Sequence, residues 1–212
     1  MLRIIAGAME YLEDNKGIIF FVFFFFGVSL IAGALLVRFM EAQQLAELNH
    51  AFLVLGETLG KQTEEPLLYS TSLLKASFQK NLGLLLLMWL WGYIWFGFPF
   101  VLLLMLYKGF SLGFTVSFLV CRWSAQGVLF ALFAVLPHNL LFVPAFIGTA
   151  AGAGTYSLLK CRERFKDIYF DQKKHSTNHN FFIAVMFLLA LLGSIVEAFV
   201  TPVFTRLVFL IF

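Results

Sequence analysis

Long apolar runs separated by short polar stretches make up most of this chain. A helix of about 20 apolar residues crosses the hydrocarbon core of a bilayer, and lipid offers no partners to backbone groups outside a helix or barrel. The predicted spans cover residues 17–39, 82–107, 109–136, 139–159 and 181–202. The first run is longer than the roughly 7–15 residues of a signal-peptide core, so we interpret it as a helix that is retained. The pattern predicts an all-α, polytopic transmembrane helix bundle of about five spans, forming one membrane domain over residues 1–212.

The segment between the first two spans, residues 40–80, has a different period. Its apolar residues recur at spacings of three and four and form an amphipathic stripe: Leu45, Leu48, Phe52, Leu55 and Leu59. One interpretation is a helix that lies on the outer leaflet or packs on the bundle. The other is a surface for partner docking or dimerisation, for which these five residues are the candidates.

Composition and charge agree with a membrane location. Hydrophobic residues make up 61% of the chain and charged residues 13%, against about 25% charged in soluble proteins. Lys108 is expected in a tight turn between the second and third spans, and basic residues dominate the loop 160–180. The positive-inside rule then places the N-terminus and this loop in the cytoplasm, and the segment 40–80 and the tail 203–212 outside. The scattered basic residues favour membrane orientation and not nucleic-acid binding.

The third segment, residues 109–136, has two interpretations. A single span kinked near Arg122 agrees with the charge distribution. Alternatively, two half-helices over 109–120 and 124–136 form a re-entrant pair with Arg122 at the tip. That arrangement would place the basic loop outside.

Two ionisable residues fall within predicted spans, Arg122 and Glu197. Arg122 lies about 21 Å along its helix from Lys108, and Glu197 about 24 Å from Phe181. Because the depths match, we expect the two side chains to form an ion pair inside the bundle. A structural salt bridge and a role in transport both remain open.

A tight turn is predicted between the third and fourth spans at Pro137, His138 and Asn139. Small residues also recur at helical spacing, as Gly109 and Gly113 in the third predicted span and as Gly148 and Gly152 in the fourth. Such faces let helix backbones approach closely, either inside one bundle or in self-association as a homodimer.

Residue patterns typical of catalytic or metal sites are absent from the sequence. It contains no GxSxG, HExxH or phosphate-loop pattern and no metal-ligand spacing of Cys and His. We therefore expect no catalytic residues, no metal and no cofactor, and the chain is not predicted to be an enzyme.

Several short motifs occur in order along the chain. They are Asn81-Leu82-Gly83, Gly97-Phe98-Pro99, Lys108-Gly109, Leu136-Pro137-His138-Asn139, Val143-Pro144-Ala145, and Glu197-Ala198 with Pro202. Together they resemble the stage II sporulation protein M family of bacterial integral membrane proteins. The resemblance implies a role in endospore formation at the mother-cell septal and engulfing membrane. It also implies a scaffold whose partners are the wall hydrolases called stage II sporulation proteins P and D. Contact with membrane lipid is expected from the composition.

One departure from the family pattern concerns the predicted turn. The wider family tends to show Pro-His-Gly-x-x-Glu, whereas this chain has Phe142 at the position of the carboxylate. This favours a scaffold over the alternative, a permease or transporter subunit that uses Arg122 and Glu197.

Overall fold

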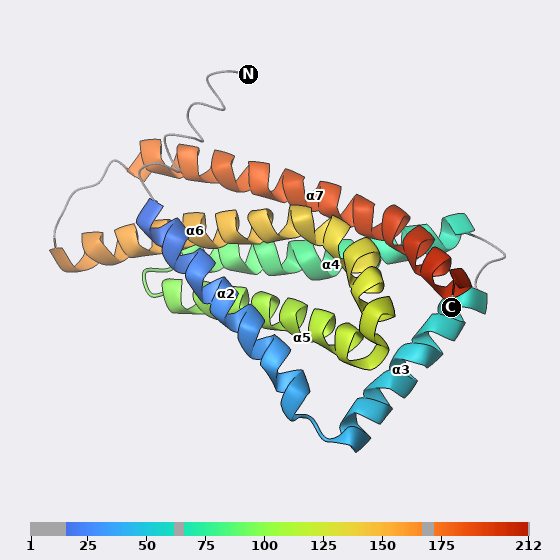
Figure 1. Cartoon of the computed structure of the whole chain (residues 1–212). Coiled ribbons are helices and arrows are strands. Elements are labelled where there is room, and N and C mark those ends of the chain that lie inside the picture. The colour runs from blue at the N-terminus through green and yellow to red at the C-terminus, as the bar shows by residue number, and fades with distance from the viewer. Residues whose placement is uncertain (1–15, 62–65, 167–171, 212) are drawn as a thin grey trace.

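The computed structural model describes residues 16–61, 66–166 and 172–211, and all of its elements are helices. They are α2 (Lys16–Phe39), α3 (Ala42–Lys61), α4 (Pro66–Gly92), α5 (Phe98–Phe130), the π-helical segment η2 (Ala131–Val135), α6 (Leu136–Lys166) and α7 (Gln172–Ile211). Five of them, α2, α4, α5, α6 and α7, form a bundle, whereas α3 lies outside it and connects the end of α2 to the start of α4 (Figure 1). The predicted all-α helix bundle is confirmed.

Helices α2 and α5 form the most closely packed pair, because glycines remove side chains from their contact. A Cβ atom added at Gly33 would lie 2.1 Å from the Phe110 carbonyl oxygen, and one at Gly113 would lie 1.9 Å from that of Leu30. The Ser29 hydroxyl at this contact donates to the Phe26 carbonyl at 2.8 Å. Small residues at these positions therefore fix α2 against α5.

The core of the bundle is apolar and draws on all five helices. Its fully buried large side chains include Val22, Leu85, Met105 and Phe146, with Ala190 beside them. Alanines and glycines of α6 occupy the centre, which lets the neighbouring helices approach this helix closely.

The chain turns at residues 93–97, inside the predicted second span. Gly97 has no room for a side chain, since a Cβ atom there would lie 1.7 Å from the Trp91 carbonyl oxygen. Pro99 then falls in the first turn of α5, where a missing backbone N–H costs nothing. The Ser157 hydroxyl of α6 fixes the turn by accepting from the Phe98 amide at 3.0 Å and donating to the Ile94 carbonyl at 2.7 Å. This is a correction: the helix predicted over 82–107 is two helices, and Lys108 lies within α5 instead of in a turn.

The second reversal is at Ser124, whose backbone dihedrals are φ 47° and ψ −121°. Residues 125–135 then fold back against the part of α5 that precedes Ser124, where Phe130 and Ala134 pack on Leu119. Gly127 allows this approach, because a Cβ atom there would lie 1.9 Å from the Leu119 carbonyl oxygen. The preferred single kinked span over 109–136 is therefore wrong. The reversal lies beside Arg122, as in the re-entrant alternative, but its first arm begins at Phe98.

The basic regions at the start of α2 and the end of α6 lie at the same end of the bundle as the turn at 93–97 (Figure 1). Lys160 at the end of α6 donates to the Tyr93 carbonyl at 3.0 Å, and the Arg164 guanidinium lies 5.6 Å from the Trp95 ring centre. The N-terminus of α2, at Lys16, lies at the same end. The first part of the predicted basic loop 160–180 is thus the helical end of α6, and residues 167–171 lie outside the described part of the chain.

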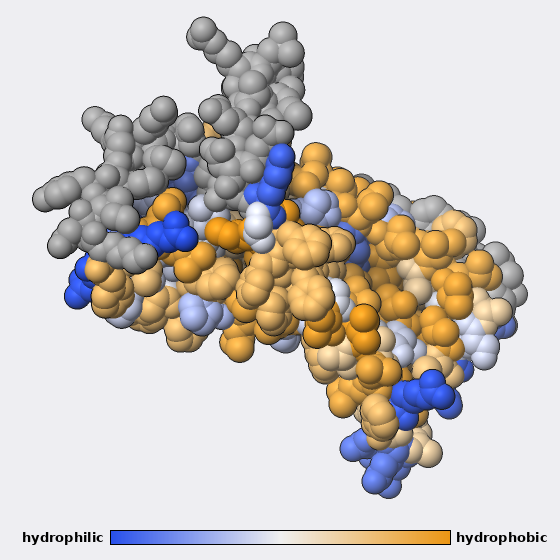
Figure 2. Space-filling view, turned by 60° about the vertical axis from the view of Figure 1, so that its left-hand side comes forward, coloured by the Kyte–Doolittle hydropathy of each residue, from blue (hydrophilic) through white to orange (hydrophobic). Residues whose placement is uncertain are grey.

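The outer surface of the bundle is apolar, as Figure 2 shows for one face. Large exposed side chains include Phe20 at 71% and Leu103 at 63%. Three helical stretches within the described ranges are long and apolar enough to cross a membrane: Lys16–Phe39, Phe98–Phe165 (which contains the reversal at Ser124) and His179–Phe199. An apolar exterior over these helices is what a lipid environment requires. Helix α7 continues through Pro202 to Ile211, so most of the predicted tail 203–212 is helical.

Candidate functional site

A cluster of polar side chains lies between α4, α5 and α7, inside the bundle. The Glu197 carboxylate on α7 accepts hydrogen bonds from the Ser77 hydroxyl and, at 3.2 Å, from the Asn81 amide of α4. The Lys108 ammonium on α5 donates to the Asn81 side-chain oxygen at 2.7 Å. Asn81, which is almost fully buried, therefore connects an acid to a base across three helices.

Aromatic rings surround the Lys108 ammonium on its other side. Its Nζ atom lies 5.3 Å from the ring centre of Phe142 and 4.7 Å from that of Phe146, both on α6. Cation–π attraction to such rings partly replaces the water that the ammonium loses in the bundle. In this chain the acid near Lys108 is Glu197.

His138 and Asn139 extend the cluster toward η2. The Nδ1 atom of His138 lies 3.2 Å from the Thr201 hydroxyl, which donates to the Ala134 carbonyl at 3.2 Å. The Asn139 amide donates to the Val135 carbonyl at 2.8 Å. The carbonyls that accept these bonds belong to the π-helical segment η2. A π-helical turn is a helix irregularity that is frequent at functional sites.

The cluster lines a cavity of about 180 Å³. Lys80, Lys108, Glu197 and His138 contribute its ionisable groups. Two ammonium groups and one carboxylate line the cavity, so the charges of its Lys and Glu side chains sum to a positive excess. Such a site can hold water or an anionic group. Ionisable residues inside a bundle of membrane helices are candidates for a functional role.

Arg122 and Glu197, predicted to pair, are not brought together. Arg122 is exposed beside the reversal at Ser124, whereas Glu197 binds Ser77 and Asn81. No ion pair joins the two predicted partners, both of which are described. The depth argument failed because the helix that carries Arg122 begins at Phe98 and not at Gly109.

The predicted turn at Pro137, His138 and Asn139 is also corrected. All three residues are helical, within the first turn of α6 directly after η2. The reversal between the helices lies at Ser124 instead, where a positive φ angle changes the chain direction.

The four glycines predicted for close packing all lie inside the bundle. A Cβ atom at Gly109 would meet Ser29 Oγ of α2 at 2.1 Å, and Gly113 faces α2 in the same way. A Cβ atom at Gly148 would meet the Met186 sulfur of α7 at 2.4 Å, and one at Gly152 would meet Ile183 at 3.3 Å. In this structure both glycine pairs serve packing within one chain.

The amphipathic stripe falls on α3, which packs extensively against no other described helix. Leu45 and Leu48 are half-buried. The side chains of Phe52, Leu55 and Leu59 lie outside the described part of the structure. Their role in partner binding remains a prediction.

Sequence reasoning missed Lys108, Asn81 and Ser77 as site residues. Lys108 was placed in a turn because one lysine between two apolar runs resembles a loop residue. The available signal was Gly97-Phe98-Pro99, which is typical of a chain break before a helix. Within the described residues, no three His, Cys, Asp or Glu side chains are grouped as metal ligands would be.

Comparison with known proteins gives one family. The family described as stage II sporulation protein M matches residues 22–202, which include the bundle and its polar cluster. No curated protein and no solved structure gives a significant match. The chain therefore belongs to the stage II sporulation protein M family and is a sporulation-related membrane protein.

Proposed function

We propose that the protein is a membrane scaffold in endospore formation. It would recruit and stabilise the peptidoglycan hydrolases stage II sporulation proteins P and D at the septal membrane, where the mother cell engulfs the forespore. The family membership supports the sporulation role. The choice of partners follows from the resemblance described above.

The observation that carries this proposal is the position of α3. This amphipathic helix leaves the bundle after Phe39 and returns to it only at the start of α4 (Figure 1). An amphipathic helix that packs extensively against no other described helix suits a partner that binds helices, or a membrane interface. It connects to the ends of α2 and α4 that lie opposite the basic end of the bundle. The positive-inside rule places that side outside the cytoplasm, where wall hydrolases act.

Charged substitutions on α3 test the scaffold. Leu45→Glu and Leu48→Glu place carboxylates on the half-buried side of the helix, whereas Ala46→Glu places one at an exposed position as the matched control. Each variant is reconstituted with the two hydrolases, and co-purification is measured together with membrane insertion. We expect the leucine variants to insert normally but to lose the hydrolases, and Ala46→Glu to retain them. Failure of the unsubstituted protein to co-purify either hydrolase would overturn the proposal, and equal recruitment by all variants would exclude α3 as the docking element.

A permease is the second candidate, favoured by the polar cavity around Glu197 and Lys108. A carboxylate and an ammonium that share one buried amide line this cavity, where each can exchange a proton with water or bind a solute. Liposomes containing the protein would show solute or proton flux that Glu197→Gln abolishes. Absence of flux, with hydrolase recruitment intact, excludes this candidate.

A further inference from the structure

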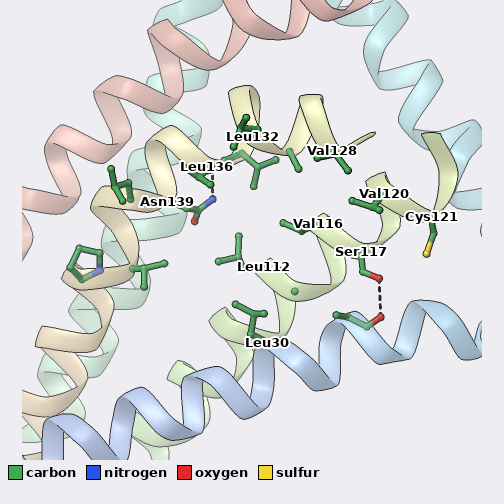
Figure 3. A pocket seen from close by; sticks show the side chains of 17 residues that line it. Leu30, Leu112, Val116, Ser117, Val120, Cys121, Val128, Leu132, Leu136 and Asn139 are labelled. Atoms are coloured by element: carbon green, nitrogen blue, oxygen red, sulfur yellow. Dashed lines mark hydrogen bonds between the residues drawn. The ribbon is translucent and has the colours of Figure 1, made fainter. Parts of the chain in front are cut away.

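An apolar groove of about 700 Å³ lies between α2, α5, η2 and α6. Leu30, Leu112, Val116, Val128, Leu132 and Leu136 line it and approach a common space from three sides (Figure 3). Its volume falls in the range of roughly 300–1,000 Å³ that ligand sites occupy. The Ser117 hydroxyl on its wall donates to the Ala34 carbonyl at 2.9 Å, so this hydroxyl is already satisfied.

The groove borders the polar cavity of Lys108. Leu112, Val135 and Asn139 line both spaces, which therefore meet along one wall. Asn139 directs its amide to the Val135 carbonyl at this boundary (Figure 3). An apolar space thus lies beside a small polar one, and the two together match a ligand with a chain and a polar head.

The charges of the polar end select the head group. The polar cavity is lined by the ammonium groups of Lys80 and Lys108 and by one carboxylate, that of Glu197. An ammonium has three donors, and the Asn81 oxygen takes one from Lys108, which leaves donors for a second acceptor. An anion with a single negative charge would balance the remaining positive charge.

We propose that the groove and the cavity together bind an anionic phospholipid of the surrounding bilayer. One acyl chain lies along the groove, and the phosphate is bound by Lys80 and Lys108. This site is independent of hydrolase recruitment.

A phospholipid fits the site better than a helix of a second copy does. The outer rim of the groove is open to the surroundings, since Leu136 is 49% exposed and Leu140 is 70% exposed. In a bilayer, acyl chains fill such a space without the ordering of another protein, because lipid tails are as apolar as leucine. A partner helix also leaves the two ammonium groups unmatched, whereas basic pockets between membrane helices bind anionic head groups.

The test measures retained lipid. The full chain is incorporated into bilayers of equal parts phosphatidylglycerol and phosphatidylcholine and extracted mildly, and native mass spectrometry counts the bound lipids. Lys80→Gln removes an exposed charge that lines the site, and Lys75→Gln removes an exposed charge on the same helix that does not. Leu136→Trp fills the groove, and Leu103→Trp, at a position 63% exposed outside both spaces, is its control.

We expect the unsubstituted protein to retain phosphatidylglycerol in preference to phosphatidylcholine. Lys80→Gln should lower that preference about fivefold, the factor for one lysine near a lipid phosphate. Leu136→Trp should abolish retention, and both controls should retain the lipid. Equal retention of the two lipids, or the same result for Lys80→Gln and Lys75→Gln, would overturn the site. Displacement of the lipid by millimolar inorganic phosphate would assign the polar cavity to a free anion. A change of oligomeric state in Leu136→Trp without loss of lipid would assign the groove to a second copy. Either result would contradict the proposal.

Discussion

Replacement of Gly113 by alanine tests the central packing of the bundle. The added Cβ atom would lie 1.9 Å from the Leu30 carbonyl oxygen, whereas ordinary contact begins at 3.4 Å. Helices α2 and α5 must therefore separate by about 1.5 Å, because the obstructing atom belongs to the backbone. Overpacking of this kind costs about 1–3 kcal/mol. Separation also weakens the neighbouring contacts at Gly33 and Gly109, so we expect the upper part of that range.

Gly27 provides the matched control. It lies on α2, and a Cβ atom there would meet nothing within 4 Å. Alanine at this position removes backbone freedom and is expected to be neutral or to stabilise by up to about 1 kcal/mol. Unfolding in detergent by titration with sodium dodecyl sulfate measures both variants. A loss of about 3 kcal/mol raises the unfolding constant more than 100-fold. Equal stability of Gly113→Ala and Gly27→Ala would refute the close contact between α2 and α5.

Three further predictions follow from the reversals and the polar cluster. Ser124→Gly should raise the unfolding free energy by about 1 kcal/mol and Ser124→Val should lower it, because a positive φ costs a side-chain-bearing residue about 1–3 kcal/mol; the same titration checks this, and the reverse order would contradict it. Asn81→Leu should destabilise by about 1–3 kcal/mol or more, because Glu197 and Lys108 each lose a buried partner, and an unchanged midpoint would show that the cluster does not form. In a background with both native cysteines replaced, a cysteine at Phe96 should react with a membrane-impermeant maleimide from the side of the basic loop, and a cysteine at Lys108 should not; labelling at Lys108 would restore the turn expected from the sequence.

The position of Lys108 shows where reading the sequence alone fails. The turn at 93–97 consists of Tyr, Ile, Trp, Phe and Gly and contains no charged residue, so its composition does not mark it as a break between two helices. A lysine in an apolar run looks like a loop residue, because an isolated charge is costly in lipid. In the folded bundle, Asn81 and the rings of Phe142 and Phe146 reduce that cost. These partners come from other helices, and their distances from Lys108 are not encoded in any local pattern.

The glycine pairs illustrate the same limit. Their spacing alone predicted close helix contact, and the structure shows such contact at Gly109, Gly113 and Gly148. Spacing does not name the opposite surface, because a smooth helix face suits a neighbouring helix and a second copy equally well. Only the three-dimensional arrangement identifies α2 and α7 as the neighbours.

The sequence by itself determined the class of this protein. Apolar runs of span length leave only helices as a stable backbone arrangement in lipid, and charge bias predicts their orientation. Tertiary structure decided where the chain turns and which polar groups meet. Hydropathy along the sequence measures how favourably each segment transfers into lipid. Packing between segments far apart in the chain decides the rest: the reversals at 93–97 and Ser124, and the contact of Glu197 with Asn81.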